Sequence, residues 1–138
     1  DEVVAGVAPV FSCFCSDIVH LGVVGNGQIG KAINNLVHWV NGLMLIEAGN
    51  LATAHNIDLQ KLRSAMSIAT GKSAALEQWN TMTFTWAQKD MQIVQKLTDS
   101  ANMGGPMIGL VREMVKEGRK LKAAGDVPDW TGLGTDLS

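Results

Sequence analysis

The sequence predicts a mainly α protein, a helical bundle around one long buried helix, preceded by a short helix and a single strand. No proline occurs from Gln28 to about Asn56, so ~29 residues can form a helix ~43 Å long. Breaks at 56–58 and 103–106 separate further segments whose apolar residues have helical spacing. Because 46% of the 138 residues are apolar and only 17% are charged, the chain can bury a substantial core.

The first fifteen residues have apolar side chains at helical spacing, although Pro9 demands a kink unless it lies near the first turn. The run Asp17–Leu21 then predicts a short strand that ends at Gly22. A lone strand needs neighbours in a sheet, and the sequence offers none. We therefore expect this strand to belong to a sheet contributed by residues upstream of Asp1, in which case the chain is a fragment.

The long helix after this strand is apolar around most of its circumference. Such a helix is typical of a buried axis and not of a surface element. Its apolar residues are Ile33, Leu36, Val37, Trp39, Val40, Leu43, Met44, Leu45, Ile46 and Leu51.

Four more helices are predicted after the break. Asp58 and Ser73 are good N-caps for the first two, and Gly104-Gly105-Pro106 precedes the last. The predicted ranges are 59–69, 74–80, 84–102 and 107–124. On the last helix, we expect the charged residues to be solvated. These are Arg112, Glu113, Lys116, Glu117, Arg119, Lys120 and Lys122.

Composition excludes several classes of function. A net charge of -2 argues against a nucleic-acid-binding protein. Cys13 and Cys15 are predicted to be free thiols in a reducing compartment, for which we expect the cytoplasm. The three histidines are scattered, so no metal site is expected. The most apolar run, Leu36–Ile46, is too short to span a bilayer, and no signal peptide is recognised.

The stretch at the start of the long helix allows three interpretations. Gly25, Gly27 and Gly30 match a dinucleotide-binding fingerprint, but that motif needs a second parallel strand, and the chain enters another helix after Asn56. The same stretch nearly matches a phosphate-binding loop, but Ala32 stands where a hydroxyl should bind magnesium. Both interpretations are therefore disfavoured.

The third interpretation concerns Lys31, which shares a helix face with Asn35 and lies beside Asn34. At this position we expect the positive end of the helix dipole and partial burial to disfavour the charged form of a lysine, which suits a group that transfers protons. The alternative is an ordinary first turn with a lysine facing solvent. From the residues alone, the lysine facing solvent is the favoured interpretation.

Several motifs together resemble the β-hydroxyacid dehydrogenase family, which includes 3-hydroxyisobutyrate dehydrogenases and, more distantly, 6-phosphogluconate dehydrogenase. The interdomain motif of that family is similar to Gly22, Gly25, Gly27, Gln28, Lys31, Asn34 and Asn35. Other family segments resemble, in order, Ile18–Gly22, Glu47-Ala48, Ile57-Asp58, Ser67–Ser73 and Lys89-Asp90. The resemblance covers most of the chain, and the order of its motifs makes it specific.

The resemblance implies a domain organisation and a reaction. Residues 1–24 would end an N-terminal Rossmann domain, 25–56 would form the hinge and interdomain helix, and 57–138 the C-terminal helical domain. The intact enzyme would transfer a hydride between NAD or NADP and a 3-hydroxy acid or semialdehyde. The Rossmann domain would bind most of the cofactor, so this substrate-side fragment is expected to be inactive alone.

The resemblance also implies roles for individual residues. Lys31 would be the catalytic lysine that exchanges the proton of the substrate hydroxyl, and Asn35, with Asn34 beside it, would bind the substrate. Lys89 would reach the cofactor end of the cleft, and Asp90 would help to fix that arrangement. Without the resemblance, Lys89 and Asp90 would be taken for a surface pair.

The sequence departs from the family at the position of a substrate-facing phenylalanine, where Met82 stands, with Phe84 two residues later. The substrate pocket is therefore expected to differ. The implied partners are a small β-hydroxyacid or semialdehyde and further copies of the chain, as a dimer or tetramer. The alternative function is a non-catalytic helical module of the same fold that dimerises or binds a partner, because the long apolar helix suits an interface.

Overall fold

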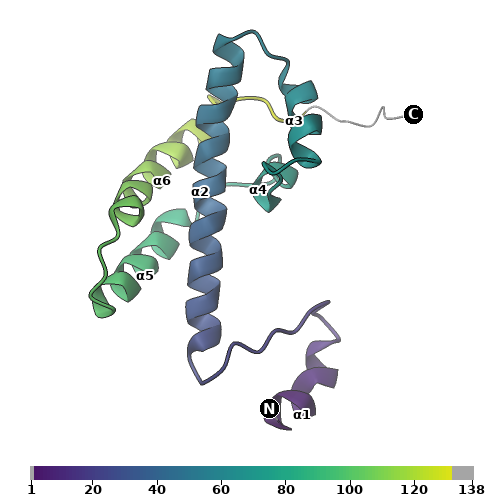
Figure 1. Ribbon diagram of the computed structural model, residues 1–138, viewed down its shortest axis with the longest axis vertical. Helices are drawn as coiled ribbons and strands as arrows, with labels where there is room; N and C mark the ends of the chain where they lie inside the picture. The colour runs from purple at the N-terminus through teal and green to yellow at the C-terminus, as the bar shows by residue number, and fades with distance from the viewer. Residues whose placement is uncertain (1, 132–138) are drawn as a thin grey trace. The chain divides into compact units, whose positions relative to one another are not determined.

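The computed structural model describes residues 2–131, which form six helices and, within that range, no strand (Figure 1). The helices are α1 (Glu2–Phe11), α2 (Asn26–Ala54), α3 (Leu59–Ser67), α4 (Ala74–Glu77), α5 (Ala87–Ser100) and α6 (Pro106–Ala124). The predicted mainly α class is confirmed. The chain divides into two compact units, residues 1–31 and 32–138. The predicted domain boundaries at 24 and 56 stay predictions.

The first unit contains α1 and a loop that leads into the first turns of α2. The predicted strand at 17–21 is wrong, because this segment has an irregular backbone. The physical reason is that a strand needs a neighbouring strand to hydrogen-bond with, and residues 2–131 contain no other strand. Helix α1 tolerates Pro9 inside it and ends at Phe11, earlier than the apolar spacing suggested.

Glycines shape the turn before α2 in two ways. Gly22 and Gly25 have φ angles of 103° and 99°, a left-handed region that disfavours side chains. Gly30 is already helical, and a Cβ built there would lie 2.2 Å from Cδ1 of Leu21. The third glycine of the fingerprint motif therefore lets Leu21 pack against the start of the helix. Asn26 closes the turn by donating from Nδ2 to the Leu21 carbonyl at 2.8 Å.

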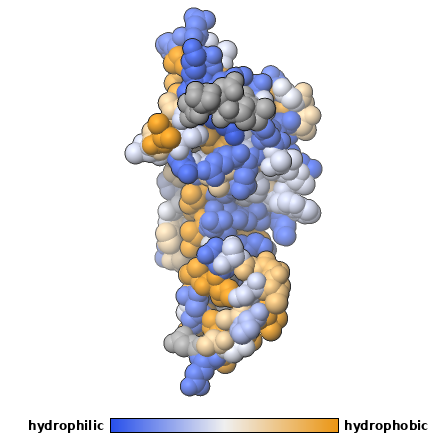
Figure 2. Space-filling model, turned by 90° about the vertical axis from the view of Figure 1, so that its right-hand side faces the viewer, coloured by the Kyte–Doolittle hydropathy of each residue, from blue (hydrophilic) through white to orange (hydrophobic). Residues whose placement is uncertain are grey.

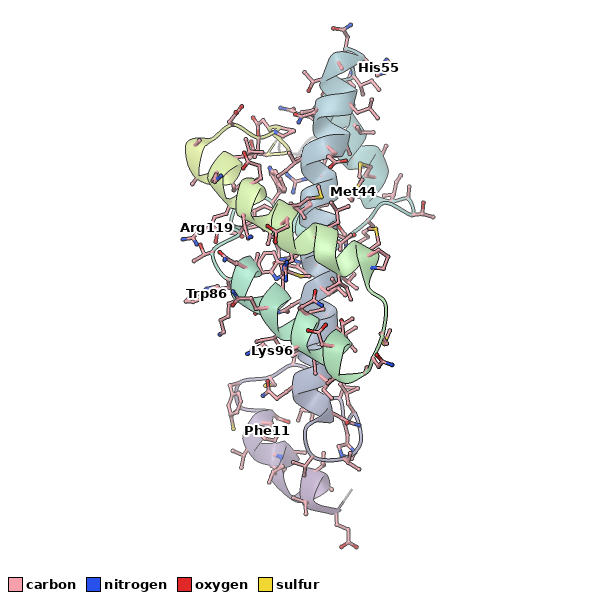
Figure 3. All side chains as sticks on the ribbon, turned by 90° about the vertical axis from the view of Figure 1, so that its left-hand side faces the viewer. Phe11, Met44, His55, Trp86, Lys96 and Arg119 are labelled. Atoms are coloured by element: carbon pink, nitrogen blue, oxygen red, sulfur yellow. The ribbon has the colours of Figure 1, made fainter. Side chains whose placement is uncertain are left out.

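The second unit is built around α2, with α5 and α6 on one side and α3 and α4 on the other (Figures 1 and 3). Its largest fully buried side chains come from α4 to α6 and from the loops around them. They are Trp79, Trp130, Phe84, Leu76, Met91 and Val115. Glycines on the helices allow close packing: a Cβ built on Gly118 of α6 would lie 2.9 Å from Cδ2 of Leu43 on α2.

Helix ends follow the capping residues that the sequence contains. Asp58 accepts hydrogen bonds from the backbone N–H groups of Gln60 and Lys61, and Ser73 accepts one from Leu76. Helix α6 begins with Pro106 and ends before Gly125, whose φ is 72°. The predicted starts of α3 and α4 are confirmed, and α6 begins one residue before the predicted Met107. Helix α5 begins three residues later than predicted.

The long helix is buried on one face only, so the predicted fully buried axis is wrong. Ile33, Val37, Met44 and Leu51, which we call the apolar stripe, are each more than half exposed. Their spacing of four, seven and seven residues places them on one side of α2. Figure 3 labels Met44 on this helix, and Figure 2 shows that hydrophobic residues reach the surface among hydrophilic ones. Apolar residues on every side of α2 therefore did not mean that other elements pack against every side of it.

Lys122 corrects the prediction that all the charged residues of the last helix are solvated. Its ammonium lies 3.7 Å from the centre of the Trp79 ring and donates to the Trp79 carbonyl at 2.7 Å. Burial lowers the pKa of Lys122, while the charge of Asp129 partly opposes that shift. A charge run cannot reveal an aromatic partner 43 positions away.

Candidate functional site

The best-defined polar cluster of the second unit centres on Asp90 in the first turn of α5. Its Oδ2 accepts from Nδ2 of Asn35 at 3.0 Å and from Nε1 of Trp39 at 3.1 Å, both on α2. Asn35 and Trp39 lie four residues apart, so they occupy the same helix face. The structure thus brings together two of the residues singled out in the sequence, Asn35 and Asp90, and adds Trp39.

Asn35 also contacts its neighbour on α2. Nδ2 of Asn34 lies 3.5 Å from Oδ1 of Asn35, at the long end of the hydrogen-bond range. Asn34 is exposed, whereas Asn35 is half-buried. Lys31 lies on the same helix, one turn before Asn35, and it is exposed, so the partial burial expected from the sequence is wrong.

Lys89 does not take part in the Asp90 cluster. Its ammonium lies 5.7 Å from the centre of the Trp86 ring, an exposed side chain at the start of α5 that Figure 3 labels. This separation allows a cation–π attraction. Lys89 therefore presents a positive charge at the surface beside an aromatic ring.

Met82 lies in the core of the second unit, with only 6% of its side chain exposed. A Cβ built on Gly42 of α2 would fall 2.2 Å from Cε of Met82 and 3.2 Å from Cζ of Phe84. Both side chains therefore fill the space that Gly42 leaves on α2. A substrate-facing role for Met82 stays a prediction.

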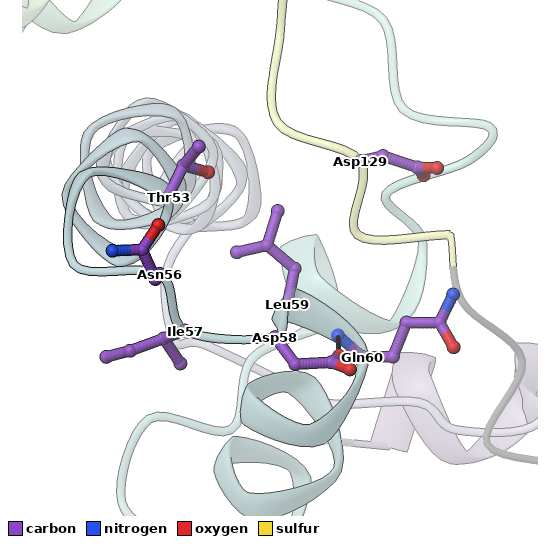
Figure 4. Close-up of a pocket in the computed structure, with 7 residues that line it drawn as sticks. All are labelled: Thr53, Asn56, Ile57, Asp58, Leu59, Gln60 and Asp129. Carbon is purple, nitrogen blue, oxygen red and sulfur yellow. Dashed lines mark hydrogen bonds between the residues drawn. The ribbon is translucent and has the colours of Figure 1, made fainter.

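Two hollows lie away from these residues. One, of about 640 Å³, is formed where α2 passes into α3 (Figure 4). It is lined by Thr53, Asn56, Ile57, Asp58, Leu59, Gln60 and Asp129. The other, of about 280 Å³, is a mostly apolar groove between α2 and α6. The hollow between α2 and α3 is wide open, and its Asp58 already accepts hydrogen bonds as the N-cap of α3. We therefore propose no catalytic role for this hollow.

A protein family described as "NAD-binding of NADP-dependent 3-hydroxyisobutyrate dehydrogenase" matches residues 25–129. This match covers most of the chain. The chain belongs to this family. The predicted resemblance to β-hydroxyacid dehydrogenases is thereby confirmed. The description assigns cofactor binding to a region that we expected to be mainly substrate-side, so the substrate-side role stays a prediction.

Relatives in this 3-hydroxyisobutyrate dehydrogenase family match about half of the chain. The probable mitochondrial 3-hydroxyisobutyrate dehydrogenase of Dictyostelium discoideum is 34% identical over 49% of this chain and 21% of its own length. The mitochondrial enzyme of Drosophila melanogaster is 32% identical over 54% and 23%, and that of Bos taurus 28% over 58% and 24%. The matched segment thus spans less than a quarter of each relative.

No helix in the part of the chain that the structure describes is both long enough and apolar enough to cross a bilayer. The thiols of Cys13 and Cys15 are free, as the sequence predicted, and the structure adds that both are exposed.

Trp39 is the residue of the cluster that the sequence analysis missed as a functional candidate. Its hydrophobicity predicts a place in the core, and its ring is indeed buried. The available signal was its position: Lys31, Asn35 and Trp39 follow one another at intervals of four along a predicted helix. Residues at this spacing share a face, so an indole N–H was predictable beside the proposed site.

Proposed function

We propose that the protein is an NAD(P)-dependent oxidoreductase acting on a 3-hydroxy acid or the matching semialdehyde, and that this chain contributes the residues that bind substrate and move its proton. The observation that carries the proposal is the hydrogen bond between Asn35 and Asp90. It joins residues from two separate family-like motifs, 55 positions apart in the chain. Family membership supports the same conclusion.

In this proposal, Lys31 handles the proton. In the oxidation, its amine accepts the hydroxyl proton of the substrate while a hydride leaves the carbon that bears that oxygen, which becomes a carbonyl carbon. The reduction returns the proton from the ammonium. When bound, NAD(P) supplies the redox chemistry by accepting or donating the hydride. Asn35 binds the substrate without adding charge, and Asp90 orients Asn35.

The residues at the start of α5 fit a cofactor carrying phosphates. Lys89 is an exposed cation, and exposed Trp86 offers an aromatic face beside it. A lysine suits a phosphate as a point charge. We propose that these groups contact the cofactor, while a Rossmann domain that includes residues 1–24 provides most of its binding. Residues 25–56 then form the hinge and interdomain helix, and 57–138 the helical domain.

The test is the oxidation of 3-hydroxy acids by the intact protein with NAD⁺ or NADP⁺. Lys31→Ala should lower kcat by about 10²–10⁴-fold, the contribution typical of general acid–base catalysis. Lys96→Ala is the matched control, because Lys96 is exposed on α5 and has no proposed role. Near-normal turnover in Lys31→Ala, with an unchanged circular dichroism spectrum, would end the assignment of Lys31.

We also propose that the protein works in a reducing compartment, and the cytoplasm remains our expectation. The free, exposed thiols of Cys13 and Cys15 support a reducing environment. The names of the relatives place those proteins in mitochondria. Fractionation of cells that produce the protein tests the cytoplasmic location, and recovery in mitochondria would overturn it.

A second candidate function is self-association through the apolar stripe of α2. Its four side chains are each more than half exposed and uncharged, and the exposed carboxylate of Glu47 lies beside them on α2. Burying such a face is the main driving force for pairing. We propose a homodimer in which the two stripes pack together, with or without catalysis.

Light scattering tests this dimer. The double substitution Val37→Lys and Met44→Lys should yield a monomer, because burying two ammonium groups is costly. Ile68→Lys is the control, since Ile68 is 91% exposed and lies off α2. A wild-type monomer, or a dimer that survives the double substitution, would exclude the stripe as the interface.

A further inference from the structure

Trp39 and Asn35 donate hydrogen bonds to the same carboxylate oxygen. The distances to Oδ2 of Asp90 are 3.1 Å from Nε1 of Trp39 and 3.0 Å from Nδ2 of Asn35. An indole nitrogen can only donate, and an ionised carboxylate can only accept. The direction of both hydrogen bonds is therefore fixed by chemistry.

The consequence for Asn35 is a fixed amide orientation. A side-chain amide has a donor end and an acceptor end, and it can rotate by half a turn to exchange them. Because the Asp90 carboxylate accepts only from Nδ2, Oδ1 of Asn35 must point away from it. Oδ1 then lies 3.5 Å from Nδ2 of Asn34. Asn35 thus presents one defined pattern of donor and acceptor.

Trp39 gives the carboxylate a rigid reference point. Its side chain is only 7% exposed, and its ring packs 5.7 Å from the ring of Phe84, centre to centre. Phe84 is itself 1% exposed. The indole N–H therefore cannot move without disturbing the core, whereas Asp90 and Asn35 are only half-buried.

We propose that Trp39 is a positioning residue: it holds the Asp90 carboxylate in place, and through Asp90 it fixes the amide of Asn35. This inference rests on the proposed function, in which Asn35 binds the substrate. The alternative is a structural role, in which the hydrogen bond only satisfies a buried indole N–H.

The first test does not depend on activity. Trp39→Phe keeps an aromatic ring against Phe84 and removes the donor. In NMR spectra of the chain, the side-chain NH₂ signals of Asn35 should lose their distinct positions and exchange faster with water. Trp130→Phe is the matched control, because it removes an indole bond of 2.9 Å to the Leu45 carbonyl in the same core. Unchanged Asn35 signals in Trp39→Phe would overturn the proposal.

The second test separates positioning from folding in the active protein. Loss of a hydrogen bond to a charged group should raise KM for the hydroxy acid by about tenfold in Trp39→Phe, with a smaller effect on kcat. Trp130→Phe should lower thermal stability and leave KM unchanged. Equal KM values in the two variants would overturn the positioning role. If the wild-type protein turns over no hydroxy acid, the proposed function fails, and the NMR test alone decides the role of Trp39.

Discussion

Trp39 and Trp130 are two buried tryptophans whose indole N–H groups bind different kinds of acceptor. Trp39 donates to the Asp90 side chain, and Trp130 donates to the backbone carbonyl of Leu45 at 2.9 Å. A carbonyl in a helix cannot turn independently of the backbone, whereas a carboxylate can rotate. A bond at Trp130 therefore fixes one stretch of chain to another, and the bond at Trp39 fixes the orientation of a side chain.

The surroundings of Trp130 support this distinction. The Pro128 carbonyl accepts from Nε1 of Trp79 at 3.2 Å, and Arg63 of α3 donates to the Trp130 carbonyl. The segment 128–130 is thus bonded to α2, to α3 and to the turn after α4. We call this set of contacts the C-terminal clamp. It holds backbone together at the Leu45 end of α2, while the Asp90 cluster orders side chains at the Asn35 end.

The largest expected effect is on the clamp. Trp130→Ala removes a fully buried indole and should lower the free energy of unfolding by about 3–5 kcal/mol. Trp39→Phe, which keeps a ring in place but loses a hydrogen bond to a charged group, should lower it less, by about 1.5–3 kcal/mol. Urea titrations followed by circular dichroism measure both. Equal losses would break the distinction between the clamp and the Asp90 cluster.

The next effect depends on space beside the clamp. A Cβ at Gly49 would lie 2.3 Å from Cβ of Pro128, so Gly49→Ala must shift the clamp and should destabilise by about 1–3 kcal/mol. Gly109, inside α6, has no heavy atom within 4 Å of a built Cβ. Gly109→Ala should therefore stabilise by about 0.5–1 kcal/mol. Thermal unfolding of the two variants should show Tm shifts of opposite sign, and shifts of the same sign would contradict the packing argument.

A smaller effect is expected at the start of α4. Oγ of Ser73 accepts from the backbone N–H of Leu76 at 3.2 Å, and Leu76 is fully buried. Ser73→Ala should cost about 1 kcal/mol, and Ser73→Asp should recover most of it, because aspartate is an equally good N-cap. Denaturant midpoints of the three proteins provide the measurement. A failure of Ser73→Asp to recover stability would show that Ser73 acts through packing.

Much of the helical arrangement was predictable because its signals are local. Asp58, Ser73 and Pro106 mark helix starts through bonds or ring geometry within a few residues. The strand predicted at 17–21 does not form, because a strand is stable only with a partner and local residues cannot show whether one is present. The prediction that α2 is buried on all sides failed for a related reason. Composition shows that a helix face is apolar, but it does not show whether another element covers that face.

The candidate site shows the same limit. Helix periodicity places Lys31 and Asn35 on one face, because that relation spans four residues. The bond from Asn35 to Asp90 spans 55 positions, and no local pattern contains it. Only the resemblance to a family linked those two motifs before the fold was known. For Trp39, helix spacing predicts the face on which the side chain lies. It does not predict that Asp90, 51 positions away, accepts the hydrogen bond of its indole N–H.

The smallest expected effect is on how stability depends on pH through Asp58, the N-cap of α3. This helix contains Arg63, which donates a hydrogen bond to the C-terminal clamp. The backbone N–H groups of Lys61 and Gln60 hold the pKa of Asp58 below its ordinary value. A carboxyl whose pKa is lower in the folded state stabilises the protein above the unfolded pKa, near 4. That stabilisation is lost as the pH falls through the folded pKa.

Asparagine caps a helix about as well and does not ionise, so Asp58→Asn should lose stability less steeply between about pH 5 and 2. The other carboxyl groups titrate in both proteins, so the difference between their urea midpoints against pH isolates Asp58. If the urea midpoints of the two proteins change in parallel with pH, the charge of Asp58 does not contribute to the stability of α3. Residue 58 would then stabilise α3 as a hydrogen-bond acceptor alone.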